Sequence, residues 1–221
     1  MKILKEETLN FFKEIKHHNN KPWFEENKPR YEAIRNDFAD FVAELVSGIK
    51  KFEFIPDKDP KKYLFRIYRD LRFSPDKTPY KTHLSAVIDR GLNETKCPFY
   101  IHIQPGESFV GGGIWQPSSD LLRRVRQEID FNGSDLNKII QSKSFKNTFG
   151  FFEGEKLSRP PKGYEVNNPN IELLKLKQYV IRHSFSDKEV CSEEFGTKVL
   201  ETYQAALDFF HFFDVVKEEQ N

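Results

Sequence analysis

Apolar side chains recur at helical spacing in two stretches near the start of the chain. Residues 6–18 carry them every three or four positions, which predicts a first helix. Residues 31–49 repeat this spacing over a longer run, so we expect a second helix with one continuous buried stripe. Pro22 predicts a turn between the two helices. Pro29 suits the first turn of the second helix, because its missing N–H costs nothing there.

The next stretch, residues 61–83, mixes aromatic, aliphatic and charged side chains. A helix is conceivable, but the short, aromatic-rich pattern favours a strand over Tyr63–Phe73, with Phe65 and the other odd-numbered apolar residues facing the core. Arg69 conflicts with this alternation, because a regular strand would bury it, and we therefore expect a bend there. Two prolines predict that residues 74–80 form a loop.

The alternation typical of strands returns in three later segments, residues 83–88, 98–115 and 178–185. The middle segment predicts a hairpin, because Pro105-Gly106 is a strong signal for a type II turn. Three glycines, residues 111–113, lie in the second strand of this hairpin. They predict either a bulge or the close approach of another backbone or a ligand.

Helical patterns occupy much of the remaining chain. They predict helices over residues 118–132, 134–149, 169–176 and 195–216. Ser186 and Glu189 have the spacing of a capping box. Together these elements predict an α+β fold: one domain over residues 1–221, whose mainly antiparallel sheet is covered on one face by helices from both termini.

Composition supports a folded chain without a membrane anchor. The 221 residues include 22 phenylalanines and 8 tyrosines, enough large aromatic side chains to build a sizeable core. The net charge of +1 argues against general electrostatic capture by nucleic acid or membrane, so any such binding has to be local. Two cysteines, no secretory leader and no apolar run of membrane-spanning length predict a cytoplasmic protein.

Four blocks of the sequence resemble a known family. They are RIYRDLRFSPDKTPYKTH, PFYIHIQPGESFVGGGIWQP, RQEIDFNG and GEKLSRPPKGY. Over essentially its whole length the chain is similar to a widespread family of bacterial and fungal proteins of uncharacterised function, domain of unknown function twenty-four sixty-one. The resemblance implies a full-length single-domain protein, and it assigns no catalytic residue.

Positive charge is concentrated in residues 61–83, which hold seven cationic side chains and two acidic ones. We predict that a bent segment gathers several of the cations around a small anion, because the planar guanidinium fork donates two parallel hydrogen bonds to carboxylate or phosphate. The alternative is structural: the arginines pair with Asp70, Asp76 or a remote glutamate and hold the loop in place. The predicted ligand-binding residues are Arg66, Arg69, Arg72, Lys81 and Tyr80.

Two histidines are the candidates for acid–base chemistry. His83 and His102 lie on predicted strands, and the imidazole pKa lies near neutrality. A carboxylate from Asp70, Asp76 or Glu107 could complete an acid–base pair with them. The alternative is that both histidines are merely hydrogen-bonded. Since no metal-ligand spacing and no phosphate-binding glycine motif occurs, the sequence predicts no metal and no cofactor.

Two hypotheses for function follow from the basic stretch. The first is a protein that binds a small anionic ligand, such as a phosphorylated metabolite or nucleotide, with catalysis left open. The second is a non-catalytic module that binds nucleic acid or an acidic protein through the same surface. Tyr68, Tyr80 and Tyr100 beside the arginines would suit single-stranded nucleic acid. The near-zero net charge of the chain favours the first hypothesis.

Overall fold

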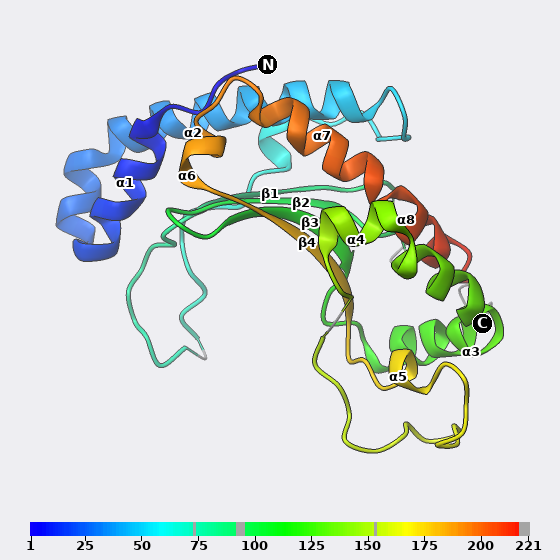
Figure 1. Ribbon diagram of the computed structural model, residues 1–221. Helices are drawn as coiled ribbons and strands as arrows, with labels where there is room; N and C mark the ends of the chain where they lie inside the picture. Colours follow the sequence, from blue (N-terminus) through cyan, green and yellow to red (C-terminus); the bar gives the residue numbers. More distant parts are fainter. Residues whose placement is uncertain (73, 92–95, 153, 217–221) are drawn as a thin grey trace. The chain divides into compact units, whose positions relative to one another are not determined.

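The computed structural model describes residues 1–72, 74–91, 96–152 and 154–216 (Figure 1). Phe73, the predicted end of the first strand, lies outside the described residues. The strands are β1 (Leu84–Ile88), β2 (Phe99–Ile103), β3 (Ser108–Ile114) and β4 (Tyr179–Phe185). The helices are α1 (Glu6–His17), α2 (Lys21–Ile49), the 3₁₀ turn η1 (Pro60–Lys62), α3 (Ser119–Gln141), α4 (Lys143–Phe149), α5 (Ile171–Leu174), α6 (Asp187–Val190), α7 (Phe195–Ala205) and α8 (Leu207–Asp214).

The N-terminal helices follow the predicted periodicity, but α2 begins earlier than expected. The predicted turn at Pro22 is wrong, because Pro22 occupies the first turn of α2 and the Asn20 side chain accepts a hydrogen bond from the Trp23 N–H at 3.1 Å. Pro29 lies inside the helix, where a proline costs about 3 kcal/mol. Apolar side chains on both sides of Pro29 are buried, and this packing offsets the lost backbone hydrogen bond.

The predicted strand beginning at Tyr63 is wrong for residues 63–72. Two isolated antiparallel bridges replace a continuous ladder in this stretch. A strand would turn Phe65 to the same side as Tyr63 and Ile67. Instead Tyr63 and Ile67 are buried, while Phe65 is 46% exposed. The two buried residues anchor the stretch, and the side chains between them are free to face solvent.

Four strands form an antiparallel sheet in the order β1-β2-β3-β4, which confirms the hairpin and the strands predicted on either side of it. In β2, Phe99, Ile101 and Ile103 are buried, and the residues between them are half-buried. Gly106 has a φ of 75°, the left-handed conformation that the second central residue of a type II turn requires. The turn therefore sets the register of the hairpin as predicted.

The three glycines of β3 permit the close approach of other chain segments. A Cβ atom at Gly111 or Gly113 would collide with the backbone of β4. A Cβ atom at Gly112 would collide with the Pro98 carbonyl oxygen and would lie 2.5 Å from Cζ of Phe210. Of the two possibilities predicted for these glycines, close approach is the one realised.

The later helices form with different boundaries from those predicted. α3 continues through Asn132, whose φ of −115° is non-helical, so the predicted break is a kink. The predicted closing helix over residues 195–216 is divided into α7 and α8. The capping box is confirmed, since Ser186 accepts a bond from the Glu189 N–H while the Glu189 carboxylate accepts one from the Ser186 N–H.

The chain forms two compact units, and β2, β3, β4 and α7 each contribute residues to both. Unit 1 comprises Met1–Ile88, Tyr100–Val110 and Ser184–Glu201. Within it α1 packs against α2, and α2 packs against β1 (Figure 1). Phe195 at the start of α7 packs edge-on against Phe185 of β4, with ring centroids 5.2 Å apart.

Unit 2 comprises Asp89–Phe99, Gly111–His183 and Thr202–Asn221. Within it α3 contacts α4, α5 and α8. Phe210 of α8 packs on Phe99 of β2, and Phe213 packs on Tyr179 of β4. Helices thus pack on the strands in each unit. The α+β class is confirmed, while the assignment of one domain to residues 1–221 stays a prediction.

Candidate functional site

Half-buried side chains, together with the exposed ring of Phe65, gather in unit 1 beside the buried core of the strands. We name this group the open-face cluster. Two members come from β2, one from β3, one from the hairpin turn, and three from the segment that leads into β1. The cluster consists of Phe65, Lys81, His83, Tyr100, His102, Gln104 and Phe109.

His102 is held from both ends of its ring. Its Nε2 lies 2.9 Å from Oε1 of Gln104, and its Nδ1 lies 3.2 Å from the hydroxyl oxygen of Tyr100. Because an amide oxygen only accepts, Nε2 carries the proton and the Tyr100 hydroxyl donates to Nδ1. Burial is the main cause that lowers the pKa of His102, and this favours the neutral ring. Both nitrogens of His102 are therefore engaged within the cluster.

His83 directly precedes β1 and lies beside His102, with ring centroids 4.2 Å apart. Burial, assisted by the charges of His102 and Lys81, lowers the pKa of His83 to about 4. Among the described residues nothing hydrogen-bonds to its ring, and neither ring nitrogen is sealed from solvent. At neutral pH His83 therefore offers one donor and one acceptor to a molecule on this face.

Lys81 supplies a cation at the edge of the cluster. Its ammonium donates to the backbone carbonyl of Arg66 at 2.9 Å and lies 5.1 Å from the centroid of the Phe65 ring. Burial, followed by the nearby charge of Arg66, lowers the pKa of Lys81. The ammonium still has two N–H groups available for a ligand, because a lysine carries three.

Aromatic rings form the rest of the surface. Phe109 stacks on His102, with centroids 4.9 Å apart and planes at 18°. Phe65 meets Tyr100 edge-on at 6.5 Å. The pairing of Phe109 with His102 follows from the Pro105-Gly106 turn, which sets these two residues opposite each other across the hairpin.

Two of the arginines predicted to bind an anion form ion pairs with carboxylates of the chain. Arg69 is half-buried and bonds to Asp76, to the hydroxyl of Thr78 and, at 3.3 Å, to the hydroxyl of Ser74. Arg72 holds Asp70 with two parallel bonds, the shortest at 2.6 Å. These contacts realise the structural alternative that the sequence left open. Arg69, which conflicted with the strand pattern, ties the loop to the segment that precedes it.

The remaining predicted residues lie in different surroundings. Arg66 is exposed, and no described residue hydrogen-bonds to its guanidinium. Tyr80 is buried, and its ring stacks on Phe24 with centroids 4.1 Å apart. Asp70, a candidate catalytic residue, bonds to Arg72 rather than to either histidine. The structure therefore brings together Lys81, His83 and His102, with Arg66 adjoining them.

Sequence reasoning missed three members of the cluster as site residues. Phe65 was predicted to face the core. The sequence pattern gives no functional role to Gln104 or to Phe109. The hairpin turn predicts that Phe109 lies opposite His102, so this residue could have been found. The exposure of Phe65 could not, because it depends on the failure of residues 63–72 to form a strand.

Comparison with known proteins supports the resemblance seen in the sequence. The model of a family described as conserved hypothetical protein (DUF2461) matches residues 7–212. No curated protein and no solved structure matches the chain. In the described part of the chain, no helix combines the length and the apolar character needed to cross a membrane. Within the same residues, no three His, Cys, Asp or Glu side chains are grouped so that they could hold a metal ion.

Proposed function

The chain belongs to the conserved hypothetical protein family DUF2461, and we propose that it binds a small anionic ligand at the open-face cluster. One observation carries this proposal. Lys81 and Arg66 make no ion pair with any described carboxylate, and they adjoin a neutral His83 whose ring nitrogens make no described hydrogen bond. Two unpaired cations beside a vacant donor and acceptor match a carboxylate- or phosphate-bearing molecule.

The three groups would share the work of holding the anion. Arg66 presents a planar guanidinium fork, Lys81 presents two N–H groups, and His83 presents one N–H. Lys81 is partly withdrawn from water, so its attraction for an anion is screened less than that of a fully exposed lysine. Tyr100 holds His102, and the His102 ring lies beside the His83 ring. The ring nitrogens of His83 therefore stay available to the ligand.

Binding would also change the chemistry of His83. A nearby anion favours the imidazolium form, so the pKa of His83 would rise from about 4 toward neutrality when the ligand is bound. A histidine in that range can donate a proton to its ligand. The arrangement therefore supports anion binding first, and acid catalysis only on a bound ligand.

We place this activity in the cytoplasm. Cys97 and Cys191 are both thiols in the structure, as is usual for proteins of a reducing compartment.

The proposal is tested by thermal unfolding with inorganic phosphate or acetate at constant ionic strength. A ligand present at a hundredfold excess over its Kd raises the melting temperature by about 5 °C or more for a chain of this size. Lys81→Met and Arg66→Gln should each remove most of this increase. Arg159→Gln, which removes an exposed arginine in unit 2, should leave it unchanged. No stabilisation by either anion, or equal stabilisation of all four proteins, would overturn the proposal.

Single-stranded nucleic acid is the second candidate ligand. The observation that favours it is the exposure of two rings on the cationic stretch, Phe65 at 46% and Tyr68 at 49%. Bases stack on exposed aromatic rings beside cations. Fluorescence anisotropy with a labelled twelve-nucleotide thymidine strand separates the two candidates. Tight binding that weakens steeply with salt would favour nucleic acid, and its absence together with stabilisation by phosphate would favour the small anion.

A further inference from the structure

The open-face cluster exposes an aromatic surface beside its cations. Phe65 is 46% exposed, its ring lies under the Lys81 ammonium, and its edge meets Tyr100. Phe109 and His102 continue the surface with a stacked pair that is only half-buried. Flat rings prefer to stack in offset or edge-on arrangements, so this surface suits a flat ligand better than a compact or branched one.

The charge of the cluster limits the charge of its ligand. Of the four predicted cations, Arg69 and Arg72 are neutralised by Asp76 and Asp70. Only Arg66 and Lys81 remain without a carboxylate among the described residues.

Asp70 and Glu107 also interact electrostatically with groups of this surface. Hydrogen bonds from Arg72, followed by the charge of Arg66, lower the pKa of Asp70, and the charge of Glu107 acts on His102. A single acidic group can be held between Arg66 and Lys81, whereas a polyphosphate would carry more negative charge than these two cations balance.

We infer that the ligand is a flat aromatic ring system that carries one acidic group. This inference rests on the proposed function and narrows it. The ring would lie against Phe65 and Phe109, and the acidic group would lie between Arg66 and Lys81. An aromatic carboxylate and a nucleoside monophosphate share this chemistry.

Isothermal titration calorimetry, which measures binding affinity, tests the inference with matched pairs of compounds. Indole-3-carboxylate is compared with cyclohexanecarboxylate, and adenosine monophosphate with ribose 5-phosphate. The aromatic member of at least one pair should bind about tenfold tighter, since stacking adds to the attraction between charges. The pair that shows this preference tells whether the ligand is an aromatic carboxylate or a nucleoside monophosphate. Adenosine, which lacks the acid, and adenosine triphosphate, which adds charge, should both bind more weakly than adenosine monophosphate.

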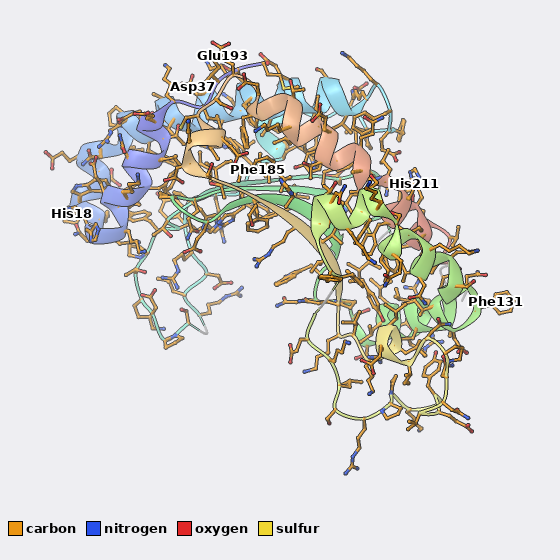
Figure 2. All side chains as sticks on the ribbon, in the orientation of Figure 1. His18, Asp37, Phe131, Phe185, Glu193 and His211 are labelled. Atoms are coloured by element: carbon orange, nitrogen blue, oxygen red, sulfur yellow. The ribbon has the colours of Figure 1, made fainter. Side chains whose placement is uncertain are left out.

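Two phenylalanine variants connect the preference to the cluster. Phe65→Ala should abolish the preference for the aromatic member and leave the binding of its non-aromatic partner unchanged. Phe131 is the matched control, because it is 89% exposed and points away from α3 in unit 2 (Figure 2). Phe131→Ala should keep the preference. Thermal unfolding of both variants checks that they are folded, which their exposure favours.

The outcomes separate this inference from the proposed function. Equal affinities within both pairs, with binding still lost in Lys81→Met, would overturn the inference that the ligand is aromatic. The proposed anion binding would remain supported. Affinity that grows with charge, so that adenosine triphosphate binds most tightly, would also overturn the inference. Absence of binding by every acid would overturn the proposed function as well.

Discussion

Acid should destabilise the folded protein through His83, and His83→Gln should relieve that effect. In the folded state burial holds the pKa of His83 at about 4, whereas the unfolded chain has the ordinary value of 6.5. Between these two values the unfolded state binds more protons than the folded state. Stability therefore begins to fall as the pH drops through 6.5, and the loss is complete below about 4.

The size of the effect follows from the two pKa values. At about 1.4 kcal/mol for each pKa unit, the ceiling is roughly 3 kcal/mol. The His83 ring is only half-buried, and solvent screening reduces the expected difference to about 1–2 kcal/mol. Glutamine has no charge to acquire, so His83→Gln should lose less stability than the wild type over the same range.

Urea unfolding at pH 7 and pH 4 measures this difference. Carboxylates common to both proteins also titrate between pH 7 and pH 4. For each protein we therefore take the change in unfolding free energy between these two pH values, and we compare the change in the variant with the change in the wild type. His17→Gln, which replaces an exposed histidine of α1, is the control and should follow the wild type. Titration of the His83 Cε1 proton by NMR reports the pKa directly. A pKa at 6.5 or above, with identical pH dependence in all three proteins, would refute the burial argument.

Two further predictions concern the stability of the fold. Gly112→Ala should lower the unfolding free energy by several times the roughly 1 kcal/mol expected for Gly106→Ala. A Cβ atom at residue 112 would meet the Phe210 ring and a backbone oxygen, whereas a Cβ atom at residue 106 would meet nothing within 4 Å. Equal melting temperatures for these two variants would contradict the close packing at Gly112. Asn20→Ala should lower the unfolding free energy by about 1 kcal/mol, because it removes the cap on the Trp23 N–H, while Asn20→Gly should cost only a few tenths. A larger loss for glycine than for alanine in urea unfolding would count against this cap.

The sequence alone determined the elements whose signals are local. The apolar periodicity predicted α1, the greater part of α2 and the alternation of Phe99, Ile101 and Ile103 in β2. Pro105-Gly106 predicted the turn of the hairpin, because glycine adopts the required positive φ without strain. Ser186 and Glu189 predicted their capping box for the same reason: all of the partners lie within a few residues of one another.

Tertiary packing decided the course of the chain where local signals conflict. Pro29 lies inside α2, because the burial of Phe24 before it and of the stripe from Tyr31 onward outweighs the hydrogen bond that it removes. Residues 63–72 alternate like a strand except at Arg69, yet the anchoring of Tyr63 and Ile67 leaves Phe65 exposed. No pattern within the stretch itself distinguishes these outcomes.

The candidate site shows the same division. The sequence identified the basic stretch and the two histidines, since residue type alone reveals charge and titratable groups. It could not say which cations would be neutralised, because Arg69 and Arg72 find their carboxylates only after the loop has folded back. Nor could it place His83 against His102, or lower the pKa of His83, since both depend on β1 and β2 lying side by side. The sequence determines which ionisable groups are present, whereas their burial and their ion-pair and hydrogen-bond partners are determined only by the folded chain.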